Sequence, residues 1–193
     1  VGRRPEGTAV RRPLSFVLGL SLSGAIGASA QSPPSTEREP RFGPPGTHGR
    51  LEAVCSLFPL GPAAKPFLPV LTRITRDPDA EVRMAALNAL GRLGPQGRAA
   101  IPAVAERLED PVAGVRSHAA WALGSIGVPG ARVISKLAEL LRDEDPHVRE
   151  NSAWTLGIYG KASLPALAAL ERLLRDASPR VRERAAGALS GIG

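Results

Sequence analysis

The chain has 193 residues, of which 43% are hydrophobic and only 4% are aromatic, so its core must be built from Ala, Leu, Val and Ile. That composition suits close-packed helices better than sheets, and the single cysteine, Cys55, excludes an intramolecular disulfide. The formal net charge is +7, but residues 51–193 carry 18 basic and 15 acidic side chains. We expect no nucleic-acid partner, because such proteins concentrate positive charge on a folded face.

Residues 1–30 are interpreted as a signal peptide. Arg11 and Arg12 precede an apolar run from Leu14 to Ile26, and Ala28-Ser29-Ala30 forms an A-x-A cleavage site. The apolar run is short and contains Ser and Gly, so we expect no membrane span after cleavage. This interpretation predicts an exported protein, periplasmic or secreted. The alternatives are a cytoplasmic protein with a functionless basic leader, or a mitochondrial-type presequence.

After a Pro-, Gly- and Ser-rich linker at residues 31–49, the chain repeats one pattern every 33 residues. The recurring residues are Asp at 77, 110, 143 and 176, Val-Arg at 82–83, 115–116, 148–149 and 181–182, Leu at 90, 123, 156 and 189, and Gly at 94, 127, 160 and 193. A fixed period of this length predicts a solenoid. The predicted array at 50–193 comprises a degenerate unit at 50–76, full units at 77–109, 110–142 and 143–175, and a half unit at 176–193. We expect the array to be cut short, because the final helix pattern lacks a partner.

Each unit contains two helical patterns. In the first, Val82, Ala86 and Leu90 share one face at a spacing of 3.6 residues. The second runs from about Arg98 to Glu109, with Pro102 near its start, where a missing N–H is tolerated. The sequence therefore predicts a stack of two-helix units.

Helix ends are also marked in the sequence. The positions that precede the first helices are Asp79, Val112, Asp145 and Ser178. Three of these four side chains can cap a helix N-terminus, whereas valine cannot. Gly91 and Gly94 are expected to end the first helix, because glycine readily adopts the left-handed conformation found there.

The units resemble HEAT repeats, in particular the short HEAT-like repeats of phycobilin lyases. The resemblance is carried by D-P-x-x-x-V-R, A-A-x-A-L-G-x-I/L-G and A-x-I-P-A-V. It implies an all-α fold, a right-handed α-solenoid of stacked two-helix repeats behind a disordered or helical N-terminal leader, with the second helices lining the concave side. It also implies a structural ladder in which turn aspartates meet first-helix arginines between neighbouring repeats. The ladder residues would be Asp77, Arg83, Asp110, Arg116, Asp143, Arg149, Asp176 and Arg182.

No motif points to catalysis, a cofactor or a metal. The three histidines, His48, His118 and His147, lack metal-ligand spacing. Deoxyhypusine hydroxylase resembles these repeats but binds iron through His-Glu pairs. Here Ala119 and Val148 follow the two later histidines, which argues against a di-iron site.

Two features are candidate partner-binding surfaces. Trp121 and Trp154 occupy equivalent positions one unit apart and form either an exposed aromatic ridge or covers over the seams between repeats, and the packing of solenoid helices favours the second. The other feature is the outward row of the second helices, whose mixed charge suits a protein partner, although an ordinary solvated face would look the same. This row comprises Arg73, Glu106, Glu139 and Arg172.

The sequence thus predicts a non-catalytic protein–protein interaction scaffold that presents a concave helical surface. Two alternatives remain, a subunit of a bilin-lyase-like enzyme that handles tetrapyrroles and a nucleic-acid-binding HEAT-like protein. The buried setting expected for Cys55 and the expected export disfavour the lyase, and the nearly balanced charge of residues 51–193 disfavours the nucleic-acid binder.

Overall fold

The computed structural model of the chain describes residues 46–127 and 130–193, and these residues are helical with no strand. The predicted signal peptide at 1–30 and residues 31–45 of the predicted linker lie outside the described residues. Helix α1 spans Thr47–Cys55, so the last three residues of the predicted linker already belong to the helical array.

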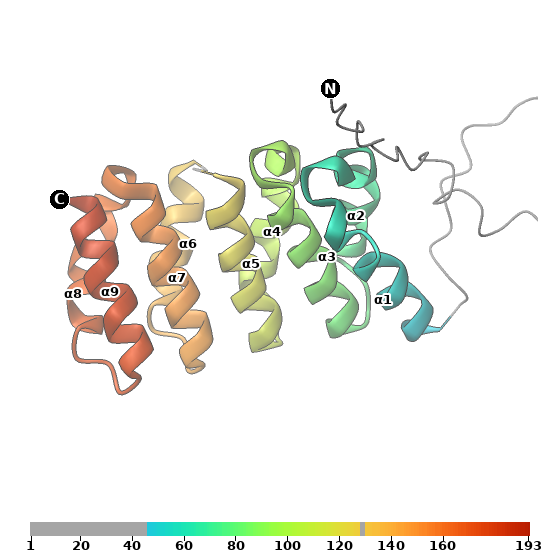
Figure 1. Ribbon diagram of the computed structural model, residues 1–193. Coiled ribbons are helices and arrows are strands. Elements are labelled where there is room, and N and C mark those ends of the chain that lie inside the picture. The colour runs from blue at the N-terminus through green and yellow to red at the C-terminus, as the bar shows by residue number, and fades with distance from the viewer. Residues whose placement is uncertain (1–45, 128–129) are drawn as a thin grey trace, which may run out of the picture. The chain divides into compact units, whose positions relative to one another are not determined.

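The helices form two rows, which Figure 1 shows as a nearer and a farther layer. The first row consists of α1, α3 (Ala80–Arg92), α5 (Ala113–Ile126), α7 (Pro146–Tyr159) and α9 (Pro179–Ile192). The second row consists of α2 (Leu68–Ile74), α4 (Ile101–Glu106), α6 (Ala131–Leu140) and α8 (Leu167–Leu173). This is the predicted α-solenoid of two-helix repeats.

The second helices are shorter than their sequence patterns suggest. A 3₁₀ segment, Gly94–Ala100, precedes α4, and another, Arg107–Glu109, follows it. Similar segments, Phe58–Phe67 and Gly160–Ala166, precede α2 and α8. Pro102 lies in the first turn of α4, where a backbone N–H would have no partner within the helix. The α-helix therefore begins at Ile101 rather than at Arg98.

The capping predictions are confirmed at three of the four positions for which they were made, those that precede α3, α5 and α7. Asp79 accepts a hydrogen bond from the Glu81 N–H at 2.8 Å. Asp145 likewise caps α7, and Val112 provides no side-chain cap for α5. The prediction for Ser178 is wrong, because its side chain accepts no capping bond at α9. The turn is organised instead by the aspartate two residues earlier, whose Oδ1 accepts the Ser178 N–H at 2.8 Å.

The two glycines expected to end the first helix have different roles. Gly94 lies just beyond α3 with a φ of +56°, a conformation that favours glycine. Gly91, in contrast, lies inside α3, so it does not end the helix as predicted. A Cβ at this position would lie 2.3 Å from the ring atom Cζ3 of Trp121.

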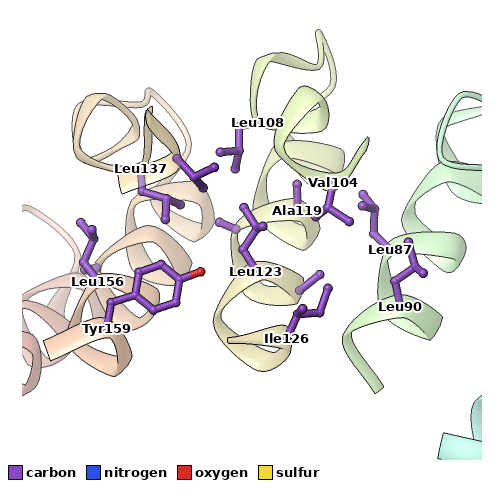
Figure 2. Packing of buried hydrophobic residues seen from close by; sticks show 14 of the residues in the cluster. Leu87, Leu90, Val104, Leu108, Ala119, Leu123, Ile126, Leu137, Leu156 and Tyr159 are labelled. Atoms are coloured by element: carbon purple, nitrogen blue, oxygen red, sulfur yellow. The ribbon is translucent and has the colours of Figure 1, made fainter. Parts of the chain in front are cut away.

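A continuous apolar core fills the space between the two rows. Leu90 of α3, Leu123 of α5 and Leu156 of α7 occupy equivalent positions and are fully buried. Val104, Leu108 and Leu137 reach them from the second row, as Figure 2 shows. Cys55 is half-buried, less than the buried setting that was expected, and it packs against the same core.

The two rows differ in how closely their helices approach. Consecutive first-row helices pack directly on one another, whereas second-row helices pack mainly on the first row. Small side chains allow this approach: a Cβ added to Gly157 of α7 would lie 2.8 Å from the Cα of Ala188 in α9. The prediction that the second helices line the concave side stays a prediction.

Among the described residues, no single helix is long and apolar enough to cross a membrane. The stretches Thr47–Cys55 and Phe58–Ile74 meet such a criterion of length and composition only as a pair, and they are bent by 99° relative to each other.

Candidate functional site

The turn edge of the array carries the predicted ladder of Asp–Arg pairs. Arg83 of α3 donates from Nε and Nη2 to the two carboxylate oxygens of Asp110, both at 2.9 Å. Its Nη1 donates to the carbonyl oxygens of Asp77 and Pro78, at 2.9 and 3.0 Å. Each arginine therefore joins its own turn to the next repeat. The same arrangement recurs in Arg116–Asp143 and Arg149–Asp176.

The ladder continues one pair further toward the N-terminus than was predicted. Arg50 of α1 donates to Asp77, with Nε 2.8 Å from Oδ2. Arg50 lies 33 residues before Arg83, so the period could have identified it. Arg182 lies at the opposite end and donates to the carbonyl oxygens of Asp176 and Ala177. The pairing thus includes the degenerate first unit.

The pKa values of two ladder carboxylates, Asp143 and Asp176, are lowered, which favours their charged form. Hydrogen bonding to Arg149 is the main reason that the pKa of Asp176 is lowered. For Asp143, burial raises the pKa, but the hydrogen bonds from Arg116 and from the Asp145 N–H, with the nearby positive charges, outweigh it and lower the pKa overall. The pKa values of Arg116 and Arg149 are raised by the same hydrogen bonds. These groups cannot exchange protons near neutral pH, which suits a stacking role at each junction.

The two tryptophans lie over the seams between first-row helices. Trp154 of α7 covers Gly124 of α5, where an added Cβ would lie 2.6 Å from the ring atom Cζ3. Trp121 of α5 covers Gly91 of α3 in the same way. Sequence reasoning missed these glycines because it assigned Gly91 to a helix end. Both indole rings are half-buried, so each covers a seam and still presents part of its surface to solvent.

We use the name inner face for the first-row surface around these tryptophans, and the name refers to these residues alone. A groove of about 230 Å³ lies beside Trp121, between α3 and α5. Arg92 Nε donates to Asn88 Oδ1 at 2.8 Å, and Asn151 Nδ2 donates to Ser117 Oγ at 2.8 Å. These bonds hold the polar side chains in place around the aromatic ring. The lining residues of this Trp121 groove are Asn88, Arg92, His118, Trp121 and Asn151.

A second groove opens on the inner face between α7 and α9 and has a volume of about 390 Å³. It contains Trp154 and the exposed Ile158 from α7, and Glu183 and Arg184 from α9. Gly187 stands in it at the position equivalent to Trp121 and Trp154. The repeat pattern marks this position, but the groove itself depends on how the helices pack.

The predicted row of charged second helices lies on the other layer. Arg73, Glu106, Glu139 and Arg172 are all exposed. Arg76 Nη2 binds Glu106 Oε2 at 2.9 Å. Glu139 and Arg172 line one groove of about 280 Å³ between α6 and α8. The structure therefore brings these last two together but separates the row from the tryptophans.

The histidines and carboxylates near these grooves do not gather into a metal-binding cluster in the part of the chain that the structure describes. Within residues 46–127 and 130–193, no group of three or more His, Cys, Asp or Glu side chains could hold a metal ion. His118 Nδ1 lies 2.8 Å from the Gly114 carbonyl oxygen, which can only accept, so that nitrogen carries the hydrogen. His147 Nδ1 lies 3.9 Å from Glu150 Oε2. What the site offers is aromatic surface and polar hydrogen-bonding groups.

Comparison with known proteins agrees with the repeat architecture. The family model described as HEAT repeats matches residues 67–143 and 101–190. No curated protein matches the chain.

Solved structures of similar shape include natural and designed repeat proteins. The complex of CpcE and CpcF of phycocyanin lyase from Nostoc sp. PCC7120 aligns with a TM-score of 0.66 and 22% identity, over 86% of this chain and 70% of that chain. A designed armadillo repeat protein in complex with the peptide (KR)4 aligns with a TM-score of 0.62 and 19% identity, over 78% of each chain. An engineered protein aligns with a TM-score of 0.65 and 23% identity, over 77% of this chain and 76% of that chain. At these identities the likeness shows the fold alone.

Proposed function

Because the chain belongs to the HEAT-repeat family, we propose that it is a non-catalytic scaffold that binds an extended segment of a partner protein along its inner face. The observation that carries this proposal is the pair of half-buried tryptophans, each beside a groove on that face. Tryptophan is enriched among the residues that dominate binding energy, because it offers a large rigid surface. The fixed spacing of the repeats would hold successive contacts at regular intervals.

The polar groups around the tryptophans support a peptide ligand in particular. Asn88 and Asn151 line the Trp121 groove and carry amide groups that can bond to a peptide backbone. The designed armadillo repeat protein was solved with a peptide on a comparable stack of helices. That likeness is one of fold, and it supports the capacity of such a stack to accommodate an extended ligand.

The inner face is testable with the full chain, because its only two tryptophans both lie there. A phage library of random peptides would be selected on the chain, and enriched peptides would be titrated while tryptophan emission is recorded. We expect binding to shift or quench this emission. The matched control is Glu139→Ala with Arg172→Ala, which changes the second-row groove and should leave affinity within about twofold. An absence of enriched peptides, or binding that is lost only in this control, would contradict the proposal.

The bilin-lyase alternative has one observation in its favour, the structural similarity to the CpcE–CpcF complex of phycocyanin lyase. A lyase-type role would require the chain to bind a tetrapyrrole. Adding a bilin to the full chain should therefore leave its visible absorption spectrum unchanged if the scaffold proposal is right. A shifted and enhanced visible band at equimolar ratio would favour the alternative.

Export is proposed on the basis of the signal-like sequence at residues 1–30. Expression of the full chain in a bacterial host should then yield a processed protein outside the cytoplasm, and N-terminal sequencing should begin at Gln31. Recovery of the unprocessed chain from the cytoplasm would contradict export, and it would leave the scaffold proposal unaffected.

A further inference from the structure

Neighbouring second-row units face each other through a pair of equivalent positions that lie 30 residues apart in the chain. Arg76, which follows α2, and Glu106 of α4 occupy these positions first and form an ion pair. Arg76 Nη2 donates to Glu106 Oε1 and Oε2 at 3.0 and 2.9 Å, and Nε donates to Oε2 at 3.3 Å. Two repeats later, Arg142 and Arg172 hold the same positions. Two positive charges therefore stand where the α2–α4 junction has one charge of each sign.

The junction between α4 and α6 shows how the array compensates like charges at this pair of positions. The two residues there are Glu109 and Glu139. Lys136 of α6 forms an ion pair with Glu109 and so supplies the missing positive charge. The residue equivalent to Lys136 in α8 is Ala169, which carries no charge. The α6–α8 junction therefore lacks the compensation that its neighbour has.

The two arginines border one groove. Arg142 and Arg172 both line the groove of about 280 Å³ between α6 and α8. Their guanidinium groups make no hydrogen bond or ion pair in the part of the chain that the structure describes. Both residues stand near the C-terminal end of a helix, where an arginine commonly bonds to the last carbonyl oxygens, but these side chains do not. Two positive groups of this groove are thus available to a ligand.

The rest of the lining indicates which anion fits. Glu139 also lines the groove, so two arginines and one glutamate give it a net charge of +1. One carboxylate balances this charge, whereas a phosphate monoester carries about −1.5 to −2 near neutral pH. The other walls are largely apolar and can contact the aliphatic part of a side chain. These apolar residues are Ile134, Ala138, Pro165, Ala166 and Ala169.

We propose that the α6–α8 groove binds the side-chain carboxylate of a glutamate or aspartate in a partner protein. The carboxylate would lie between Arg142 and Arg172, as that of Glu106 lies beside Arg76. Guanidinium groups bind carboxylates through paired N–H donors. The groove belongs to the second row, so this site goes beyond the function proposed for the inner face and provides a second contact surface.

The test uses N-acetyl-glutamate amide as the probe and the isotope-labelled full chain, observed by NMR. We expect the probe to shift the Nε–H resonances of Arg142 and Arg172, while its neutral counterpart, N-acetyl-glutamine amide, shifts neither. Arg172→Gln should weaken binding by about three- to tenfold, and Glu139→Gln should strengthen it by about twofold. Absent shifts, equal shifts with both compounds, or unchanged binding to Arg172→Gln would overturn the proposal.

Arg172→Glu gives the α6–α8 junction the pair of charges found in Arg76 and Glu106. The variant should no longer bind the probe. Compared with Arg172→Gln, it should melt about 1–3 °C higher in the parent chain than the same comparison gives in an Arg142→Gln background, because only Arg142 can attract the new carboxylate. Equal differences in the two backgrounds would show that residues 142 and 172 do not face each other, which would overturn the proposal.

Glu106→Arg makes the converse change at the α2–α4 junction. It places a second arginine beside Arg76 and should create a second site for the probe, with new shifts at the Arg76 Nε–H. Glu106→Gln is the matched control, because it removes the same ion pair without adding a positive charge. If Glu106→Arg acquires no site, a facing pair of arginines is not sufficient to bind a carboxylate, and the proposal fails.

Other occupants give different results in the same spectra. Tighter binding of dimethyl phosphate than of the probe would assign the groove to a nucleic-acid backbone. Shifts at Arg142 and Arg172 that grow with protein concentration alone would assign it to a second copy of the chain. Either result would overturn the proposed partner. The probe should leave tryptophan emission unchanged, so failure at this groove does not affect the function proposed for the inner face.

Discussion

The turn edge and the inner face are built on the same first-row helices, yet they repeat differently. At the turn edge, one bidentate Arg–Asp pair recurs at every junction, as in Arg83–Asp110. On the inner face, the position of Asn88 is occupied by tryptophan in the next two repeats and then by Gly187. Stacking makes the same demand at each junction, whereas recognition needs particular groups at particular places. Among equivalent positions in one chain, those that stay the same therefore indicate stacking contacts, and those that vary indicate a surface available for recognition.

The sharpest way to test this contrast is to remove one ladder carboxylate. Asp110→Ala leaves Arg83 without its partner, and the two side chains are only 2% and 10% exposed. We expect the free energy of unfolding to fall by about 3–5 kcal/mol, because an uncompensated buried charge is costly. Urea denaturation measures the loss.

The matched control is Asp77→Ala at the first ladder pair, where Arg50 is 27% exposed and Asp77 is 10% exposed. Solvent compensates the remaining charge there, so a loss of about 1–2 kcal/mol is expected. Equal losses in the two variants would show that burial does not determine how much a ladder pair contributes to the free energy of unfolding.

The same helices offer two glycines at which one substitution should have opposite effects. Gly124→Ala would place a Cβ 2.6 Å from Trp154 Cζ3 and 2.7 Å from Thr155 Oγ1. The buried Thr155 cannot move freely, because its hydroxyl donates to the Ala120 carbonyl oxygen at 2.8 Å. We expect Gly124→Ala to lower the free energy of unfolding by about 1–3 kcal/mol.

Gly187→Ala is the counterpart, since its added Cβ meets nothing within 4 Å. Higher helix propensity should raise the free energy of unfolding by about 0.5–1 kcal/mol. Chemical denaturation of both variants measures the two changes in the free energy of unfolding. A stabilising Gly124→Ala would mean that the tryptophan does not require the glycine beneath it.

Acid should weaken the ladder. The pKa values of Asp143 and Asp176 are lowered in the folded chain, so their contribution to stability is complete above the unfolded pKa of about 4. It is lost as the pH falls through the lower folded values. Urea denaturation at a series of acidic pH values measures this loss.

Arg149→Met removes the main cause of the lowered pKa of Asp176. The variant should therefore lose less stability between about pH 5 and pH 3 than the parent chain does. Arg172→Met, at an exposed second-row position, is the control and should keep the parent's pH dependence. If the Arg149→Met variant loses as much stability in acid as the parent, the ladder is not the source of the pH dependence.

The smallest effect on stability is expected on the inner face. Asn88→Ala with His118→Ala removes two half-buried polar side chains from the Trp121 groove. The free energy of unfolding should change by no more than about 0.5 kcal/mol per substitution, as is usual for surface sites. Affinity for a selected peptide should fall by about tenfold or more. The reverse outcome, lost stability with unchanged affinity, would show that these side chains stabilise the fold and do not contribute to binding.

Much of the fold could be predicted from the sequence, because stacking imposes a strict period. The 33-residue step identified the first-row helices and the recurring Asp and Arg positions, and the resemblance to HEAT-like repeats implied that these residues pair. The same step would have located Arg50. The role of Gly91 could not be read in the same way. A glycine near the end of a helical pattern is consistent with both a helix stop and a close contact, and only the position of Trp121 distinguishes them.

The candidate site was predictable only in part. Trp121 and Trp154 were identified from their equivalence, and Glu139 and Arg172 do share a groove. The prediction that the second helices line a concave side is not tested by the contacts between helices and stays a prediction. The α7–α9 groove is marked in the sequence by Gly187, but a single glycine does not reveal an open space.

By itself, the sequence determined that this protein is a stack of two-helix units in which an Asp and an Arg recur every 33 residues. Local signals and exact repetition suffice for that, because each unit presents the same apolar face to its neighbour. Only the tertiary structure decided which glycines lie beneath an aromatic ring and where the grooves open between neighbouring helices. Those features depend on distances between helices, which are set jointly by side chains that lie about one repeat apart in the chain.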